Sequence, residues 1–339
     1  MDKNSTGNPG NNIADRYLDM LSGQRKLSDN TVENYRRDLE QLAELAGKTA
    51  LISLSSADIR RFISQLHAGG LSPRSLGRKL SAWRGLFQWL VIDLGGPQGV
   101  EESVINTNPA EDIHAPKKDK PLPKALAVDD AVRLVSADSG REHVSEAGKI
   151  SALCDHAMFE LLYSSGLRVS ELTGLDIHSV RQSGYTSTGW IDLNEKEVTV
   201  TGKGSKTRIV PVGDAAVAAI EKWLAVRDRF TRPDTNQNDT YALFLNSRGH
   251  RMSVRLVQLR IKDHARRLGL PINVHPHILR HSFASHILQS SGDLRAVQEM
   301  LGHASIASTQ VYTALDFQHL AKVYDSAHPR ARAGKKGNS

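Results

Sequence analysis

Length, composition and charge exclude several classes of protein before any motif is considered. The 339 residues suggest two domains, and a hydrophobic content of 39% is enough for ordinary cores. No run of eighteen apolar residues occurs, and the polar start MDKNSTGNPGNN lacks the apolar core of a signal peptide, so membrane insertion and secretion are not expected. One cysteine, Cys154, excludes an internal disulfide framework and a cysteine-based zinc site, which favours a reducing cytoplasm.

The first third of the chain predicts a small helical domain. Residues 1–11 are expected to be disordered, and a helix is expected around residues 13–21. Apolar periodicity and capping residues predict three more helices, which together with the first form a domain over residues 12–96. These three helices follow Asp29, Ser55 and Ser72, and they stop at Gly47, Gly69 and Gly95.

The rest of the chain predicts a linker and a mixed second domain. Residues 97–124 are rich in proline and lysine and are expected to link the two domains. In residues 125–314, helices are expected after Asp129 and over 154–164, followed by a hairpin whose arms flank Gly202-Lys203-Gly204 and then by further helices. Residues 315–339 predict an amphipathic helix, with Phe317, Leu320, Val323 and Tyr324 on its apolar face, and a basic tail.

Basic residues gather in two stretches of the chain, whose formal net charge is +7. Residues 60–84 hold six Lys or Arg and no acid, and residues 248–280 hold eight against a single acid, Asp263. Two separated basic patches suit a protein that grips a DNA duplex from two sides. A pair of solvated helix faces is the alternative, and the sequence leaves both open. The first patch comprises Arg60, Arg61, Arg74, Arg78, Lys79 and Arg84.

Residues 275–312 bring together side chains that could attack a phosphodiester without a metal: His277, Arg280, His303 and Tyr312. A phenol is a weak nucleophile at neutral pH unless its surroundings help, and a lone tyrosine near an apolar helix usually belongs to the core. His277 follows Pro276 near a helix N-terminus, where backbone N–H groups attract an anion. Arg280 lies three residues on, on the same helix face.

Two earlier motifs could complete such a site. Arg168 would supply a second fixed cation, and two arginines can clamp the non-bridging oxygens of one phosphate. Glu171 could orient a neighbour or simply pair with Arg168. Lys203, at a turn with two glycines, could protonate a leaving oxygen, although an ordinary turn lysine is the commoner case.

Metal and nucleotide cofactors are not expected. His275, His277, His281 and His286 could suggest a metal cluster, but no HExxH motif occurs and no acid lies between Pro271 and Gly292. His281 and His286 are expected to pack or to form hydrogen bonds. The GKGSK segment lacks the P-loop pattern.

Five ordered motifs resemble the tyrosine site-specific recombinases of the phage integrase family, and specifically the bacterial Xer recombinases. The resemblance covers nearly the whole chain from about residue 12 and implies a mainly α protein with a small β-sheet in the catalytic domain, in the two-domain recombinase architecture. The tail looks more like the XerC branch of the family than the XerD branch. The segments are GLRVSEL (166–172), TGKGSKTRIVPV (201–212), HPHILRHSFASHIL (275–288), LGHASIASTQVYT (301–313) and DFQHLAKVYDSAHPRA (316–331).

The resemblance implies a role for each site residue. Arg168 and Arg280 would bind the scissile phosphate and Lys203 would protonate the 5′-hydroxyl leaving group. His277 would assist proton transfer, and His303 would hydrogen-bond the phosphate. Tyr312 would form a 3′-phosphotyrosyl link, and Glu171 matches the acidic position that supports the site. Three loops, near 95–107, 138–149 and 181–189, look longer than the family pattern.

The resemblance also implies partners. They are a dif-like site on double-stranded DNA, a XerD-like recombinase in a heterotetramer on which the C-terminal helix would dock, and a DNA translocase such as FtsK. The implied function is resolution of chromosome or plasmid dimers without metal or ATP. A phage or integron integrase is one alternative, although the chain starts too close to its first domain to hold an arm-binding domain. A noncatalytic DNA-binding architectural protein is the other.

Overall fold

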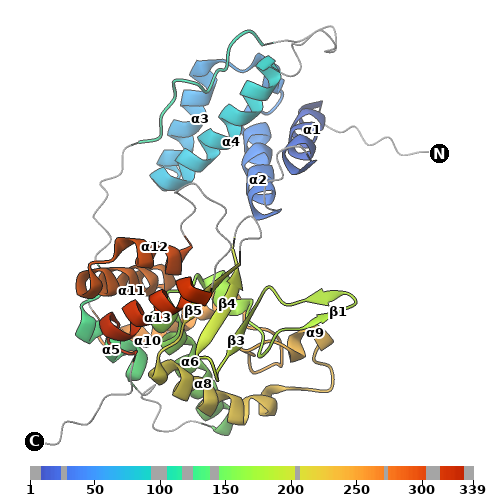
Figure 1. The fold of residues 1–339 in the computed structure, drawn as a ribbon. Coiled ribbons are helices and arrows are strands. Elements are labelled where there is room, and N and C mark those ends of the chain that lie inside the picture. Colours follow the sequence, from blue (N-terminus) through green and yellow to red (C-terminus); the bar gives the residue numbers. More distant parts are fainter. Residues whose placement is uncertain are drawn as a thin grey trace, which may run out of the picture. The chain divides into compact units, whose positions relative to one another are not determined.

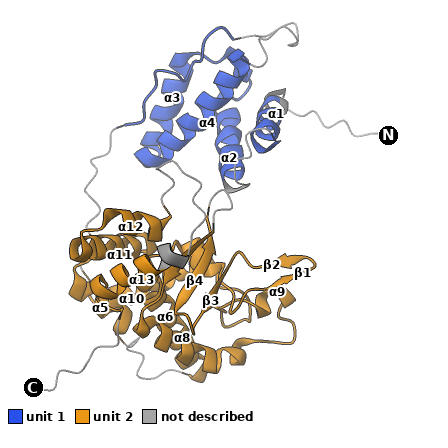
Figure 2. Ribbon diagram, viewed as in Figure 1, with its two compact units in different colours: residues 1–121 blue, residues 122–339 orange. Residues whose placement is uncertain are grey.

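The computed structural model describes residues 9–23, 29–92, 105–116, 125–137, 145–202, 207–270, 274–302 and 314–331. The chain divides into two compact units, residues 1–121 and residues 122–339 (Figure 2). None of the helices in the described ranges combines the length and the hydropathy that a membrane crossing needs.

Unit 1 is helical, as the sequence predicts. Its core holds aromatic and aliphatic side chains from all four α-helices, among them the fully buried Trp83 and Phe62. The capping box of Ser55 and Asp58 is present, which confirms the predicted start of the second of the three helices. The elements are α1 (Pro9–Gly23), α2 (Asp29–Ala46), η1 (Leu51–Ser53), α3 (Ser56–Ala68) and α4 (Pro73–Ile92).

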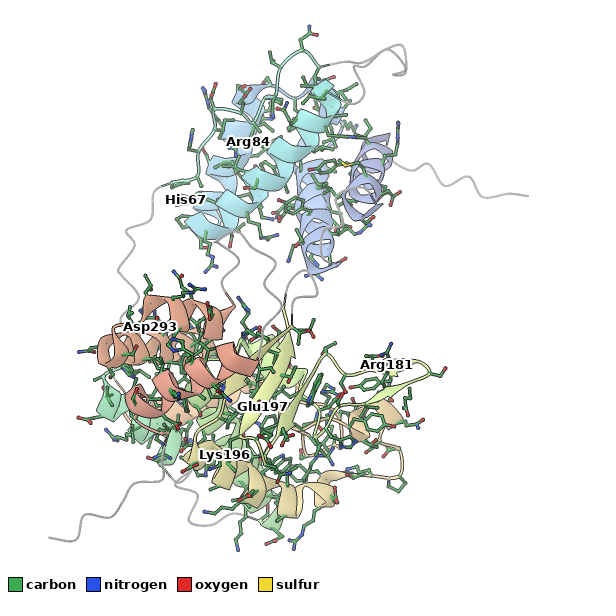
Figure 3. All side chains as sticks on the ribbon, in the orientation of Figure 1. His67, Arg84, Arg181, Lys196, Glu197 and Asp293 are labelled. Carbon is green, nitrogen blue, oxygen red and sulfur yellow. The ribbon has the colours of Figure 1, made fainter. Side chains whose placement is uncertain are left out.

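Two segments of unit 1 differ from the expectation. Helix α1 begins at Pro9, inside the stretch expected to be disordered. Residues 105–116, inside the expected linker, pack on α4: Ala110 and Ile113 are buried, and Arg84 donates to both of their carbonyls at 3.3 and 2.9 Å. Figure 3 labels Arg84 on α4. The half-buried Arg84 therefore holds this segment through its backbone carbonyls, a contact that the proline and lysine content of the sequence did not predict.

Unit 2 combines helices with two small antiparallel sheets. In the three-stranded sheet, β4 pairs with β3 on one side and with β5 on the other, and the β4–β5 pair confirms the predicted hairpin arms. Helices α11, α12 and α13 lie on the β5 side of this sheet and the β1–β2 hairpin on the β3 side (Figure 1). The strands are β1 (Arg181–Gln182), β2 (Tyr185–Thr186), β3 (Gly189–Asp192), β4 (Glu197–Thr201) and β5 (Thr207–Pro211).

The helices of unit 2 enclose two hydrophobic clusters. The larger one is centred on α6, which is buried along most of its length and packs against α8, α11 and α5. The smaller one joins β5, α11, α12 and α13. The helices are α5 (Val128–Ser136), α6 (Glu146–Ser165), α7 (Val169–Thr173), α8 (Asp214–Arg227), η2 (Asp228–Phe230), α9 (Gln237–Thr240), α10 (Val254–Arg267), α11 (Pro276–Ser291), α12 (Leu294–Leu301) and α13 (Ala314–Ala327).

The C-terminal helix α13 packs on its own unit in the single chain. Leu320 and Tyr324 are each 1% exposed, and the Tyr324 hydroxyl lies 2.7 Å from the Ser164 hydroxyl. Beyond the helix, Arg330 forms an ion pair with the fully buried Glu160 of α6. The apolar face predicted for this helix therefore covers α11 and β5.

The loop near 181–189, which looks long in the sequence, forms the β1–β2 hairpin. Its Tyr185 hydroxyl donates to the buried carboxylate of Asp176, which also accepts from Arg251 at 2.6 Å. The hairpin therefore extends the unit as an anchored element.

Candidate active site

The first part of the candidate site forms where α6 ends and α7 begins. Gly166 ends α6 in the left-handed conformation at φ 56°, and a Cβ there would lie 2.3 Å from the Phe283 ring, so only glycine fits. Arg168 then caps α7. Glu171, one turn later, accepts from the Arg168 backbone N–H and from its Nη1, both at 2.8 Å.

Arg280 connects the junction of α6 and α7 to α12. Pro276 opens α11, and Arg280 lies just over one turn further along the helix with only 9% of its surface exposed. Its Nη1 donates to the Gly166 carbonyl at 2.5 Å and its Nη2 to the Leu301 carbonyl at 2.6 Å. One guanidinium therefore holds the end of α6 beside the end of α12.

A third arginine, Arg208 on β5, belongs to the same cluster. Its Nη1 and Nη2 donate to the two carboxylate oxygens of Glu171, each at 2.8 Å, and its Nε donates to the Met300 carbonyl at 2.9 Å. This residue was not predicted from the sequence. The available signal was its strand position two residues before the buried Val210, which places a charged side chain on the inward face of β5.

The cluster carries an excess of positive charge. Burial, followed by the neighbouring charge of Arg168, lowers the pKa of Arg280 to about 10, so it stays protonated at neutral pH. Burial alone would raise the pKa of Glu171, but hydrogen bonds from Arg208 and Arg168, together with the charge of Arg208, outweigh it and hold the pKa at about 2. Three guanidinium groups around one carboxylate favour an added anion such as a phosphate oxygen.

Of the other four residues predicted for the site, the structure describes only one, His277. His277 is exposed and is the second residue of α11, and its ring lies 6.1 Å from that of His275. Lys203, His303 and Tyr312 lie outside the described residues. The structure thus brings Arg168, Glu171 and Arg280 together.

The neighbouring histidines do not form a metal cluster. His286 is buried, with one ring nitrogen 2.9 Å from the Tyr163 hydroxyl and the other 2.9 Å from the Leu126 carbonyl, which confirms its predicted packing role. His281 is exposed. Among the residues that the structure describes, no three His, Cys, Asp or Glu side chains are placed to hold a metal ion.

The first basic patch divides into paired and exposed residues. Arg78 and Lys79 form ion pairs with Asp38 of α2, which is fully buried. Arg60 and Arg74 are exposed. Asp38 lies some forty residues upstream of its partners, outside the stretch over which the charges were counted. The net positive charge available for DNA binding is therefore smaller than the sequence of the patch indicates.

The second basic patch divides in the same way. Arg260 pairs with Asp155 at 2.6 Å, Arg251 pairs with Asp176, and Arg280 belongs to the candidate site. Arg248 and Arg255 are exposed, so both patches combine structural ion pairs with exposed cations, a mixture that neither interpretation of the sequence anticipated.

Comparison with known proteins identifies the family to which this chain belongs. Residues 124–319 match the phage integrase family, and residues 14–92 match the phage integrase N-terminal SAM-like domain. The chain belongs to the phage integrase family of tyrosine recombinases, enzymes that break and rejoin DNA in site-specific recombination.

Individual relatives agree with this assignment. The chain is 52% identical over 320 residues to tyrosine recombinase XerC 1 of Ralstonia nicotianae, covering 93% of each chain. It is 45% identical over 323 residues to tyrosine recombinase XerC of Salmonella typhi, covering 94% of this chain and 96% of the relative. The crystal structure of the XerH recombinase bound to its difH substrate shares the fold, with a TM-score of 0.62 and 19% identity over 92% of this chain and 82% of that one.

Proposed function

We propose that this recombinase cuts and rejoins DNA through a covalent bond between Tyr312 and a 3′-phosphate. The observation that supports the proposal is the cluster of Arg168, Glu171 and Arg280, which has the charge and donors to hold a phosphodiester. The motif LGHASIASTQVYT, which contains Tyr312 and lies within the region 124–319 that matches the family, supports the choice of this tyrosine as the nucleophile.

In the proposed reaction, one phosphate ester bond is exchanged for another. The Tyr312 oxygen attacks the scissile phosphorus while the bond to the 5′-oxygen breaks, and Lys203 gives that oxygen its proton. His277 assists removal of the tyrosine proton. Arg168, Arg280 and His303 stabilise the charge of the pentacoordinate transition state. The ester stores the energy of the broken bond, so rejoining by the same steps in reverse needs neither ATP nor a metal.

We further propose a cellular role and partners for this activity. The likeness to tyrosine recombinases named XerC supports site-specific recombination. Within that class, the proposed role is that of a cytoplasmic enzyme that acts at a dif-like site and resolves chromosome or plasmid dimers. It would work in a heterotetramer with a XerD-like recombinase, under a DNA translocase such as FtsK. In that assembly α13 would dock on a neighbour through the apolar face that covers its own unit in the single chain.

A nicked suicide substrate tests the proposed activity. The substrate is a duplex carrying the dif-like site, located first by footprinting on the host chromosome, with a nick that lets the leaving fragment diffuse away. Cleavage should then trap a protein–DNA adduct that survives denaturation. Absence of an adduct with the wild-type protein would refute the proposal and favour a noncatalytic DNA-binding protein.

A further inference from the structure

Three guanidinium groups surround the C-terminal end of α12. Arg208 donates to the carbonyl of Met300, Arg280 to that of Leu301 at 2.6 Å, and Arg168 to that of Gly302 at 3.5 Å. The last carbonyls of a helix lack intrahelical partners and carry partial negative charge, so they attract cations. Two of these arginines already have a role in the proposed reaction, and Arg208 has none.

Arg208 and Arg168 share a single carboxylate. The Oε1 of Glu171 accepts from Nη1 of both arginines at 2.8 Å, and its Oε2 accepts from Arg208 Nη2 and from the Arg168 backbone, also at 2.8 Å. The side chain of Arg208 is 5% exposed and that of Arg168 is 38% exposed. The network therefore has a buried end at Arg208 and an open end at Arg168, where a phosphate can enter.

Arg208 is also held from the side of α12. Gly302 ends that helix at φ 64°, and a Cβ on it would lie 3.0 Å from Arg208 Cδ and 3.2 Å from Nε. The absence of a side chain at Gly302 leaves room for the arginine, and the Met300 carbonyl at 2.9 Å sets its direction. Arg208 is thus a rigid support for Glu171.

We propose that Arg208 is a positioning residue for the recombination reaction: it fixes the Glu171 carboxylate, which in turn orients the Arg168 guanidinium toward the scissile phosphate. The inference rests on the proposed function. Arg208 would thereby stabilise the charged transition state indirectly, through Glu171 and Arg168, without contacting DNA.

Arg208→Met tests this, with Arg227→Met as the matched control. Arg227 is equally buried, at 4% exposure, and donates to the carbonyls of Thr240 and Ala242 away from the site. On the nicked substrate, Arg208→Met should slow adduct formation about 10²-fold, because small displacements of a positioning group have effects of that size. Affinity for the intact site should stay close to that of Arg227→Met.

A substrate with methylphosphonate at the scissile position distinguishes a positioning role from a purely structural one. A structural defect would slow cleavage of the phosphate and methylphosphonate substrates equally. Methylphosphonate replaces one charged oxygen by a methyl group, so the transition state depends less on Arg168. The defect of Arg208→Met should shrink to below about 10-fold, following Arg168→Ala on the same pair of substrates. Equal defects on both substrates, or a defect no larger than that of Arg227→Met, would overturn the inference.

Two controls separate a failure of the inference from a folding defect and from a failure of the proposed function. If Arg208→Met does not fold, Arg208→Lys replaces it as the test variant. Lysine keeps the charge but cannot form the paired hydrogen bonds with Glu171, so the defect of Arg208→Lys should likewise shrink on the methylphosphonate substrate. A defect of the same size on both substrates counts against the inference. If the wild-type protein forms no adduct on the phosphate substrate, the proposed function itself fails. Adduct from the wild type together with a substrate-independent Arg208 defect refutes the inference alone.

Discussion

At the scale of single residues, the candidate site is an ion network with more positive than negative charge. Arg280 is buried between two backbone carbonyls and close enough to Arg168 and Arg208 for their charges to affect its pKa. A phosphate would relieve this repulsion. The three arginines come from elements far apart in the sequence and converge on two features. Arg168 and Arg208 donate to the Glu171 carboxylate, and all three arginines donate to carbonyls at the end of α12.

Removing Arg280 should affect chemistry more than binding. In Arg280→Ala we expect cleavage to fall by about 10²- to 10³-fold, the usual loss for one donor to a developing charge. Affinity should change little, because this is one phosphate contact among many. Adduct yield and gel shifts measure the two effects, and thermal unfolding checks that the buried site still folds. Comparable reductions in cleavage and affinity would contradict the assigned role.

The Glu171 carboxylate should make stability depend on acid pH. Its pKa is held at about 2, below its ordinary value of 4.5, so the ionised form stabilises the folded state by about 3 kcal/mol. This contribution is complete above about pH 4.5 and is lost as pH falls toward 2. Urea unfolding should show Glu171→Gln less stable than wild type at pH 7, with a gap that narrows below pH 4.5. A gap that stays constant down to pH 3 would argue against this.

At the scale of elements, local patterns predicted more than charge counts did. Periodicity and caps predicted α2, α3 and α4, because a helix start depends on residues within one turn, as the Ser55–Asp58 box shows. The pairing of Arg78 and Lys79 with Asp38 could not be predicted, because it depends on how α2 packs on α4. Arg208 was missed for the same reason: its partners lie in α7 and α12.

The exposed part of the first basic patch should carry its DNA contacts. We expect Arg60→Ala combined with Arg74→Ala to weaken binding and to reduce the slope of log affinity against log salt by up to about 2, one for each phosphate that is no longer neutralised. The matched control is Arg36→Ala with Arg37→Ala, which removes the same charge from α2, where each arginine pairs with a carboxylate. Equal slopes for the two double variants would show that the patch has no special role.

At the scale of the whole molecule, α13 has two competing places to pack. Its apolar face covers the cluster of β5, α11 and α12 in the single chain, and the proposed tetramer would offer that face to a neighbour. A helix that docks on a neighbour must therefore leave its own unit or be replaced there by another copy.

Deleting residues 314–339 should consequently affect both stability and assembly. Loss of Leu320, Tyr324 and the Arg330–Glu160 ion pair exposes an apolar cluster and leaves a buried carboxylate without its arginine, so thermal unfolding should shift to lower temperature. Below that temperature, assembly on two sites should suffer more than binding to one site. The control is deletion of 332–339 alone, and normal tetramer assembly by the longer truncation would contradict the docking role.

The central claim is that Tyr312 becomes covalently joined to DNA. The most direct measurement is peptide mapping of the adduct trapped on the nicked substrate, after digestion of both protein and DNA. We expect the nucleotide on the peptide that contains Tyr312, linked through a 3′-phosphate, and no adduct from Tyr312→Phe. A nucleotide on another residue, or an undiminished adduct from Tyr312→Phe, would contradict the claim.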